Sequence, residues 1–164
     1  LRPADLPAYK ALRDTTLADD PSAFTSDADA ERRKPAESYL PRLGLDQPLG
    51  GVFTLGAFRG AVLLGAVSCE RDLRVKARHI GHVVGMMVRA DARGLGIGRL
   101  LIEACIVQAR RANGVEMLTL SVTSSNAAAV HLYESAGFVR YGRLERAIKV
   151  GDRYHAKDQM VLML

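Results

Sequence analysis

A glycine-rich turn near the middle of the chain contains the residues best suited to binding an anion. Glycines stand at the alternate positions Gly94, Gly96 and Gly98, directly after Arg93. Because glycine has no side chain, successive backbone N–H groups can close around an anion at the positive end of a helix dipole. Each glycine in a helix start costs about 1 kcal/mol relative to alanine, and binding of a pyrophosphate would offset that cost. A tight turn with no ligand is the alternative.

Two common phosphate-binding motifs do not fit this turn. A P-loop requires Gly-Lys-Ser/Thr, whereas Gly98 is followed by Arg99 and Leu100, so the residues for magnesium and γ-phosphate are missing. A dinucleotide-binding fold places its glycines after the first strand of a βαβ unit, with an acidic residue about 20 positions later. The turn here lies past mid-chain after several strand-like runs, so this interpretation ranks a distant second.

The segments around the turn predict a single mixed domain, residues 1–164. A strand over 79–89 leads into the turn, and an amphipathic helix over 95–113 follows it. The alternation of strand-like and helical segments implies a mixed sheet with helices on both faces, of α/β (α+β) class. The predicted core stripe of the helix comprises Ile97, Leu100, Leu101, Ala104 and Val107. Further strands are predicted at 51–60, 61–72, 116–123, 138–148 and 153–164, and further helices at 5–18, 35–44 and 126–137.

Composition excludes several functional classes. The chain of 164 residues is 48% hydrophobic and 25% charged, with no apolar run near the roughly 18 residues of a membrane span. The first residues show no apolar signal core, so we expect a cytoplasmic protein. A net charge of +5 suits an anionic ligand, but aromatics are only 5% of residues, which disfavours nucleic-acid binding by base stacking. Cys69 and Cys105 are too few for a disulfide scaffold or a zinc site, so core thiols and no metal are expected.

Two segments of the chain resemble the signatures of the GNAT N-acetyltransferase superfamily. The run from Arg93 to Gly98 is similar to its first motif: Gln or Arg, two residues, Gly, one residue, then Gly or Ala. The segment 125–138 resembles the second signature, and residues 1–30 resemble the usual opening. The ordered pair of motifs, with a strand between them, makes the match specific. One departure is Ala90, where many members have Pro, and it affects only local stiffness.

The resemblance implies acetyl-CoA as cosubstrate and a mostly antiparallel sheet of six to seven strands, splayed at the strand that binds it. Gly85 is the candidate for the bulge that opens this strand. The backbone of Met87 and Val88 would pair with the pantetheine arm, and Asn126 would contact that arm while capping its helix. The backbone amides implied to hold the CoA pyrophosphate belong to Arg93, Gly94, Leu95, Gly96, Ile97, Gly98 and Arg99.

The implied reaction is acetyl transfer to a primary amine by direct attack. It requires a neutral amine, a donor for the oxyanion and a proton for the departing thiolate. Tyr133, seven residues after Asn126, matches the family tyrosine that donates to the CoA sulfur and so touches the cosubstrate. The oxyanion donor would be a strand N–H, with Val88 as the candidate. A tyrosine that only packs in the core is the alternative for Tyr133.

A general base is harder to identify. At pH 7, deprotonating a lysine-like amine costs roughly 4.6 kcal/mol, but an α-amine only about 1 kcal/mol. Some relatives have Glu eleven residues before the first motif position, where this chain has His82. A histidine can accept a proton near neutral pH, so His82 is the candidate base. Glu70, His79 and a solvent relay are the alternatives, as is a strand histidine without a catalytic role.

The sequence does not identify the acceptor amine. An acidic cluster between the first two predicted helices would attract a cationic amine, although basic residues follow at once and a solvated loop is the simpler interpretation. The alternative to an enzyme is a non-catalytic CoA-binding or sensor protein of the same fold. The family resemblance also implies a homodimer. The acidic cluster consists of Asp19, Asp20, Asp27, Asp29 and Glu31.

Overall fold

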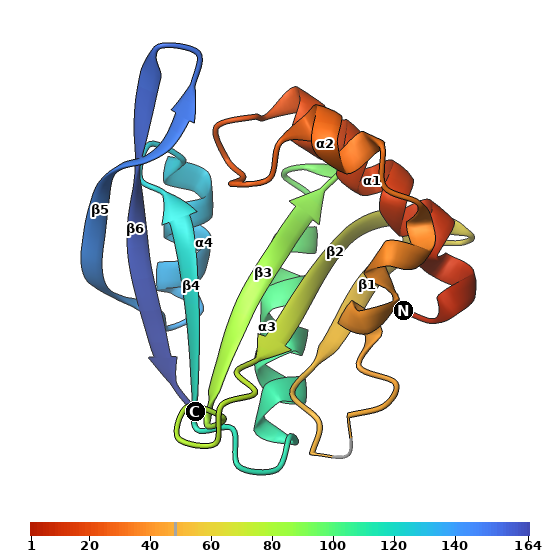
Figure 1. Ribbon diagram of the computed structural model, residues 1–164, viewed down its shortest axis with the longest axis vertical. Coiled ribbons are helices and arrows are strands. Elements are labelled where there is room, and N and C mark those ends of the chain that lie inside the picture. The colour runs from red at the N-terminus through yellow and green to blue at the C-terminus, as the bar shows by residue number, and fades with distance from the viewer. Residues whose placement is uncertain (48) are drawn as a thin grey trace.

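The computed structural model describes residues 1–47 and 49–164 and shows an open β-sheet with helices on both faces (Figure 1). Within this part of the chain the sheet has six strands, in the order β1-β2-β3-β4-β6-β5, and only β3 and β4 run parallel. The predicted mixed, mostly antiparallel α/β class is therefore confirmed. The strands are β1 (Phe53–Arg59), β2 (Val62–Arg71), β3 (Ile80–Val88), β4 (Met117–Thr123), β5 (Val139–Val150) and β6 (Arg153–Met163). The helices are α1 (Leu6–Asp19), α2 (Ala28–Arg32), α3 (Ile97–Arg110) and α4 (Ala127–Ser135), with 3₁₀ turns η1 (Pro3–Asp5), η2 (Ala36–Leu43) and η3 (Ala90–Ala92).

Each face of the sheet has its own apolar cluster. On one face α1 and η2 pack on β2 and β3 around Tyr9, Leu12 and Met87. On the other face α3 and α4 pack on the strands around a cluster that includes Ile102 and Leu118. This second cluster also contains Cys69 and Cys105, both fully buried, which confirms them as core thiols. In the described part of the chain no helix is long and apolar enough to cross a membrane.

The sheet splays between β3 and β4, as expected. The two strands pair only over 80–82 and 117–119, and beyond that point they diverge (Figure 1). On its other side β3 carries one extra residue, because Met87 opposes Ala66 while Val84 opposes Ser68. Gly85 lies in this interval with a φ of +60°, a conformation that glycine adopts at little cost. The predicted bulge at Gly85 is confirmed, and it turns the end of β3 away from its earlier course.

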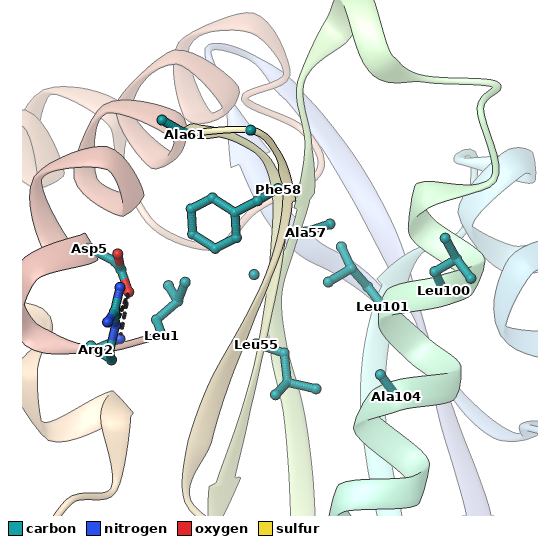
Figure 2. A pocket seen from close by; sticks show the side chains of 12 residues that line it. Leu1, Arg2, Asp5, Leu55, Ala57, Phe58, Ala61, Leu100, Leu101 and Ala104 are labelled. Carbon is teal, nitrogen blue, oxygen red and sulfur yellow. Dashed lines mark hydrogen bonds and ion pairs between the residues drawn. The ribbon is translucent and has the colours of Figure 1, made fainter.

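The buried face of α3 differs from the predicted stripe. Leu100 and Val107 are 64% and 49% exposed, and Ala104 is exposed as well. The apolar residues of this helix form two adjacent stripes, and only the one that faces the sheet is covered. Leu100 and Ala104 instead line a cavity of about 810 Å³ beside β1, with Phe58 across from them (Figure 2). The stripe that is buried consists of Ile97, Leu101, Ile102, Cys105 and Ala109.

The segment predicted as a short helix over 35–44 is a 3₁₀ helix, η2, that ends at Gly44 with a φ of +65°. Pro41 lies inside it, and proline has no N–H to donate to an α-helical ladder. The predicted end at Gly44 is correct, since Gly44 is the C-cap of η2. Only glycine fits this position, because an added Cβ would lie 1.8 Å from the carbonyl oxygen of Val52. The chain thus passes from α1 to β1 through short turns rather than a second long helix.

A buried carboxylate ties the C-terminal hairpin to the end of β4. Asp158 is 1% exposed and accepts hydrogen bonds from Arg143 Nε at 2.6 Å and from Ser124 Oγ at 2.9 Å. Arg140 lies beside it, with Nη1 at 3.3 Å. The bond from Arg143, opposed by burial and reinforced by Ser124, lowers the pKa of Asp158 to about 2. The carboxylate is therefore charged and holds β5, β6 and the end of β4 together.

Replacing Asp158 with asparagine is expected to lower the free energy of unfolding at pH 7 by about 1.5–3 kcal/mol, the range for hydrogen bonds to charged groups. Because folding lowers this pKa from an ordinary 3.8 to about 2, the contribution is complete above pH 4 and disappears as pH falls towards 2. Urea unfolding at pH 7 and pH 2.5 measures both effects. Asp152→Asn, in the exposed β5–β6 turn, is the control, and an equal loss at both pH values would contradict the assignment.

Candidate active site

A cleft of about 820 Å³ opens where β3 and β4 diverge. One end is formed by the second half of β3, the glycine turn and α4, and the other by α1, the segment 20–26 and β6. Segments far apart in the sequence thus meet at the gap in the sheet (Figure 1). The position of the cleft follows from the bulge and from the short β3–β4 pairing.

The glycine turn has backbone N–H groups that the helix itself leaves unused. Gly94 and Gly96 have φ values of +77° and +78°, and Gly96 is the N-cap of α3. The first bond of the helix runs from the N–H of Leu100 to the carbonyl of Gly96 at 3.1 Å, which leaves the N–H groups of the first turn without helical partners. An added Cβ at either Gly94 or Gly96 meets nothing within 4 Å. These glycines are therefore required by the backbone conformation, and open space lies above them.

Gly98 is required by helix packing rather than by its backbone conformation. It lies in the first turn of α3, and a Cβ there would come within 3.2 Å of Leu132 Cδ2 on α4. The third glycine of the motif therefore lets the two helices approach. The charge around the turn is also favourable to an anion, since the first turn of α3 has no acidic residue. Arg93 is exposed, and Arg99 is exposed and pairs with Glu103 at 2.8 Å.

The end of β3 presents backbone groups to the cleft. The N–H of Arg89 donates to the carbonyl of Leu64 on β2 at 2.8 Å, and antiparallel strands alternate between bonded and non-bonded pairs. Val88, opposite Gly65, is therefore in a non-bonded pair, and its N–H and C=O point away from β2 into the gap. The backbone N–H and C=O of Met87 point the other way, towards β2, and its side chain is only 1% exposed. The register favours Val88 over Met87 for a backbone contact to a ligand.

Helix α4 brings two polar side chains to the cleft. Asn126 is its N-cap, as predicted, and its side chain accepts a hydrogen bond from the N–H of Ala129 at 3.1 Å. Tyr133, two turns later, lines the cleft but is only 7% exposed. Its ring packs edge-on against Phe138, with 6.0 Å between the ring centroids. Burial raises the pKa of the Tyr133 hydroxyl above its ordinary value of 10, so the phenol stays protonated and is able to donate.

A family model for the acetyltransferase (GNAT) family matches residues 10–138. The chain belongs to this GNAT family. Its helices, glycine turn and splayed strands are those of an acetyl-CoA-dependent N-acetyltransferase, which confirms the predicted family and class of enzyme.

Two curated relatives of this GNAT enzyme illustrate the named activities among the proteins that it resembles. N-alpha-acetyltransferase 30 of Saccharomyces cerevisiae is 30% identical over 121 residues, which cover 72% of this chain and 68% of the relative. The mycothiol acetyltransferase of Salinispora tropica is 31% identical over 141 residues, which cover 84% of this chain but only 42% of the relative. The chain thus spans less than half of the mycothiol acetyltransferase that it matches.

Solved structures show the same fold over nearly the whole chain. A GNAT acetyltransferase from Streptococcus pneumoniae is 28% identical with a TM-score of 0.88, covering 100% of this chain and 96% of that one. The yncA structure from Salmonella typhimurium, which contains its cofactor acetyl-CoA, is 22% identical with a TM-score of 0.85, covering 99% and 90%. The unsatisfied amides of the turn and the open space above Gly94 and Gly96 fit the pyrophosphate of such a cofactor.

The candidate bases of this GNAT enzyme lie outside the cleft lining. His82 is not among the residues that line it, and the Nδ1 atom of His82 lies 2.7 Å from Thr119 Oγ1 on β4. Glu70, opposite His82 across β2 and β3, forms an ion pair with Arg42 at 3.2 Å. His79 precedes β3, at the end remote from the bulge. The strand count therefore leads to a strand that lines the cleft, but the side chain of His82 itself is not part of the lining.

The acidic cluster does not form a single site, because Asp19, Asp27 and Asp29 are exposed while Glu31 is buried and paired within the protein. Glu31 is 6% exposed, accepts from Arg13 Nε at 2.8 Å and from the Tyr39 hydroxyl at 2.6 Å, and also pairs with Lys34. Despite burial, which opposes ionisation, these donors lower the pKa of Glu31 to about 2. Of the five acidic residues only Asp20 lines the cleft.

Sequence reasoning missed three cationic side chains at the same end of the cleft, and only the fold brings them together. They are Arg13, Arg42 and Lys157.

Proposed function

We propose that this enzyme acetylates a primary amine by direct attack on acetyl-CoA held in the cleft between β3 and β4. The observation that carries the proposal is that the glycine turn, the outward-facing backbone of Val88 and the hydroxyl-bearing ring of Tyr133 border one cleft. Acetyl-CoA supplies the activated acetyl group. The amides from Gly94 to Arg99 would hold its pyrophosphate, whereas the predicted amide of Arg93 donates to the carbonyl of Ala90 at 3.3 Å. Val88 and Asn126 would position the pantetheine arm.

The chain supplies an oxyanion donor and an acid to the reaction. The amine nitrogen forms a bond to the thioester carbonyl carbon, and the Val88 N–H stabilises the negative charge that develops on oxygen. As the carbon–sulfur bond breaks, the Tyr133 hydroxyl donates its proton to the departing thiolate. The amine loses one proton to a water molecule in the cleft, and the tyrosinate regains one from solvent, so protons balance over the cycle.

We further propose that His82 accepts the amine proton through water rather than directly, because it lies on β3 but outside the cleft lining. Replacing His82 with glutamine, which retains a partner for Thr119, is expected to lower kcat about 100-fold for a lysine-like amine, the lower end of the range for a general base. An α-amine should be affected less, because it is easier to deprotonate. Steady-state kinetics with the two amine classes measures this. His131→Gln on the exposed side of α4 is the control, and unchanged kcat for both amines would exclude His82.

Calorimetric titration with acetyl-CoA, followed by a thiol-release screen, tests the proposed function itself. The screen includes α-amino peptides, because relatives named N-alpha-acetyltransferase are similar to this chain, together with lysine peptides, amino acids, polyamines and aminoglycosides. Binding with thiol release for one class supports the proposal. Binding without release for every amine would favour the non-catalytic sensor, and the absence of binding would overturn the proposal.

A further inference from the structure

Lys157 is a buried ammonium at the end of the cleft remote from the glycine turn. It lies on β6, is 9% exposed and lines the cleft. Its Nζ donates to Thr25 Oγ1 at 3.1 Å and to Ser121 Oγ at 3.3 Å, both neutral hydroxyls. Across residues 1–47 and 49–164, no carboxylate forms an ion pair with Lys157 within 4.0 Å.

Among the buried charges that the structure describes, Lys157 shares the lack of a carboxylate partner only with Arg71. Arg71 donates instead to the backbone carbonyls of Arg78, Leu49 and Gly50 and does not line the cleft. Arg13 is held by Glu31, and Asp158 is held by Arg143. A buried charge without an opposite charge is costly, since neutral hydroxyls replace only part of its hydration. Burial accordingly lowers the pKa of Lys157. An anion that entered the cleft would supply the missing counter-charge.

The neighbouring charges do not fill this role. Asp158 is adjacent in sequence, but its carboxylate is occupied by Arg143, Arg140 and Ser124. Asp20 lines the cleft but forms no ion pair with Lys157 within 4.0 Å. At the same end of the cleft, the guanidinium groups of Arg13 and Arg42 are paired with carboxylates. Lys157 is therefore the cation left for a ligand there.

We propose that Lys157 binds a carboxylate carried by the amine acceptor, so that the substrate is a small amine with its own anionic group, such as an amino acid. This inference rests on the proposed function and specifies its acceptor. Thr25 and Ser121 hold the ammonium in place from two sides, the segment 20–26 and β4. The carboxylate bound at Lys157 would direct the amine along the cleft towards Val88 and Tyr133, which line the same space.

Matched acceptor pairs test this inference. Thiol release is measured with amino acids, with their carboxamides and with the corresponding aminoalkylphosphonates, for the wild type, Lys157→Met and Lys157→Arg. The wild type is expected to prefer the carboxylate over the carboxamide by about 10- to 100-fold in kcat/KM, the range for a charge-assisted hydrogen bond. Lys157→Met should remove the preference by raising KM for the carboxylate, whereas Lys157→Arg should retain most of it. The phosphonates distinguish a carboxylate site from a general anion site.

The controls separate this inference from the proposed function. Lys76→Met, in the exposed connection before β3, should leave every rate unchanged. Replacing an unpaired buried charge with an apolar side chain should leave the fold intact, which a thermal melt checks. Turnover of carboxylates and carboxamides at equal rates, or a preference that survives in Lys157→Met, would overturn the inference while acetyl-CoA binding and turnover still support the function. Wild-type protein that does not bind acetyl-CoA would refute the function instead.

Discussion

Replacing Gly96 with glutamate is expected to weaken acetyl-CoA binding by about 100-fold or more. The new carboxylate would lie at the N-terminus of α3, beside the unsatisfied N–H groups that we assign to the pyrophosphate. Two like charges about 4 Å apart near a protein surface repel by about 4 kcal/mol. Because an added Cβ at Gly96 meets no atom within 4 Å, the effect should be on the ligand and not on packing. Calorimetric titration of the variant with acetyl-CoA measures it.

Gly151→Glu is the matched control for this substitution. Gly151 also has a positive φ, +57°, and open space around its missing Cβ, but it lies in the β5–β6 turn away from the cleft. Both variants therefore carry the same backbone strain of about 1–2 kcal/mol and the same added charge. Equal affinity of the two variants for acetyl-CoA would show that the glycine turn does not bind the pyrophosphate.

Replacing Tyr133 with phenylalanine is expected to lower kcat by about 100-fold or more, the usual contribution of a positioned general acid. Affinity for acetyl-CoA should change little, because the substitution removes one hydroxyl and keeps the ring that packs against Phe138. The raised pKa of Tyr133 means that the wild-type phenol is protonated at every pH used in a normal assay. No loss of activity from Tyr133 ionisation should therefore appear up to pH 9. Thiol-release kinetics over this range, with calorimetry for binding, measure both effects.

Tyr141→Phe provides the comparison, since Tyr141 is 62% exposed on β5 and does not line the cleft. It should retain full activity and the same melting temperature as the wild type. If Tyr133→Phe were as active as this control, the proton of the thiol would have to come from solvent. Tyr133 would then be a core residue at the wall of the cleft.

The parts of the site formed by backbone were the most predictable from sequence. A pyrophosphate site built from backbone N–H groups requires glycines before a helix. The glycines at positions 94, 96 and 98 meet this requirement and can be recognised in the sequence. Gly85 likewise signals its bulge, because few other residues adopt a positive φ within a strand. Asn126 signals a helix start by the chemistry of its side chain. Each of these features depends on neighbours close in sequence.

The features that were mispredicted or missed depend on tertiary contacts. Periodicity shows that α3 is amphipathic, but it does not show which of two adjacent apolar stripes faces the sheet, so Leu100 was placed in the core while it is 64% exposed. The role of His82 as a base stays a prediction, because its position is counted along the chain, whereas the strand register and the bulge decide which side chains line the cleft. Lys157 carries no local signal, because its burial depends on Thr25 and Ser121, which are 132 and 36 residues away.

The three-residue pairing of β3 with β4 divides the sheet into two halves, or leaves, that are joined at one end. One leaf consists of β1, β2 and β3, and the other of β4, β6 and β5. The leaves share the apolar cluster under α3 and α4, so they meet through side chains where their backbones have separated. A ligand bonded to Val88 in the gap would contact both leaves and so couple their unfolding. Occupancy at 100 times the dissociation constant would add about 2.7 kcal/mol to the free energy of unfolding. The cosubstrate would thus complete the cooperative structure of the domain as well as its chemistry.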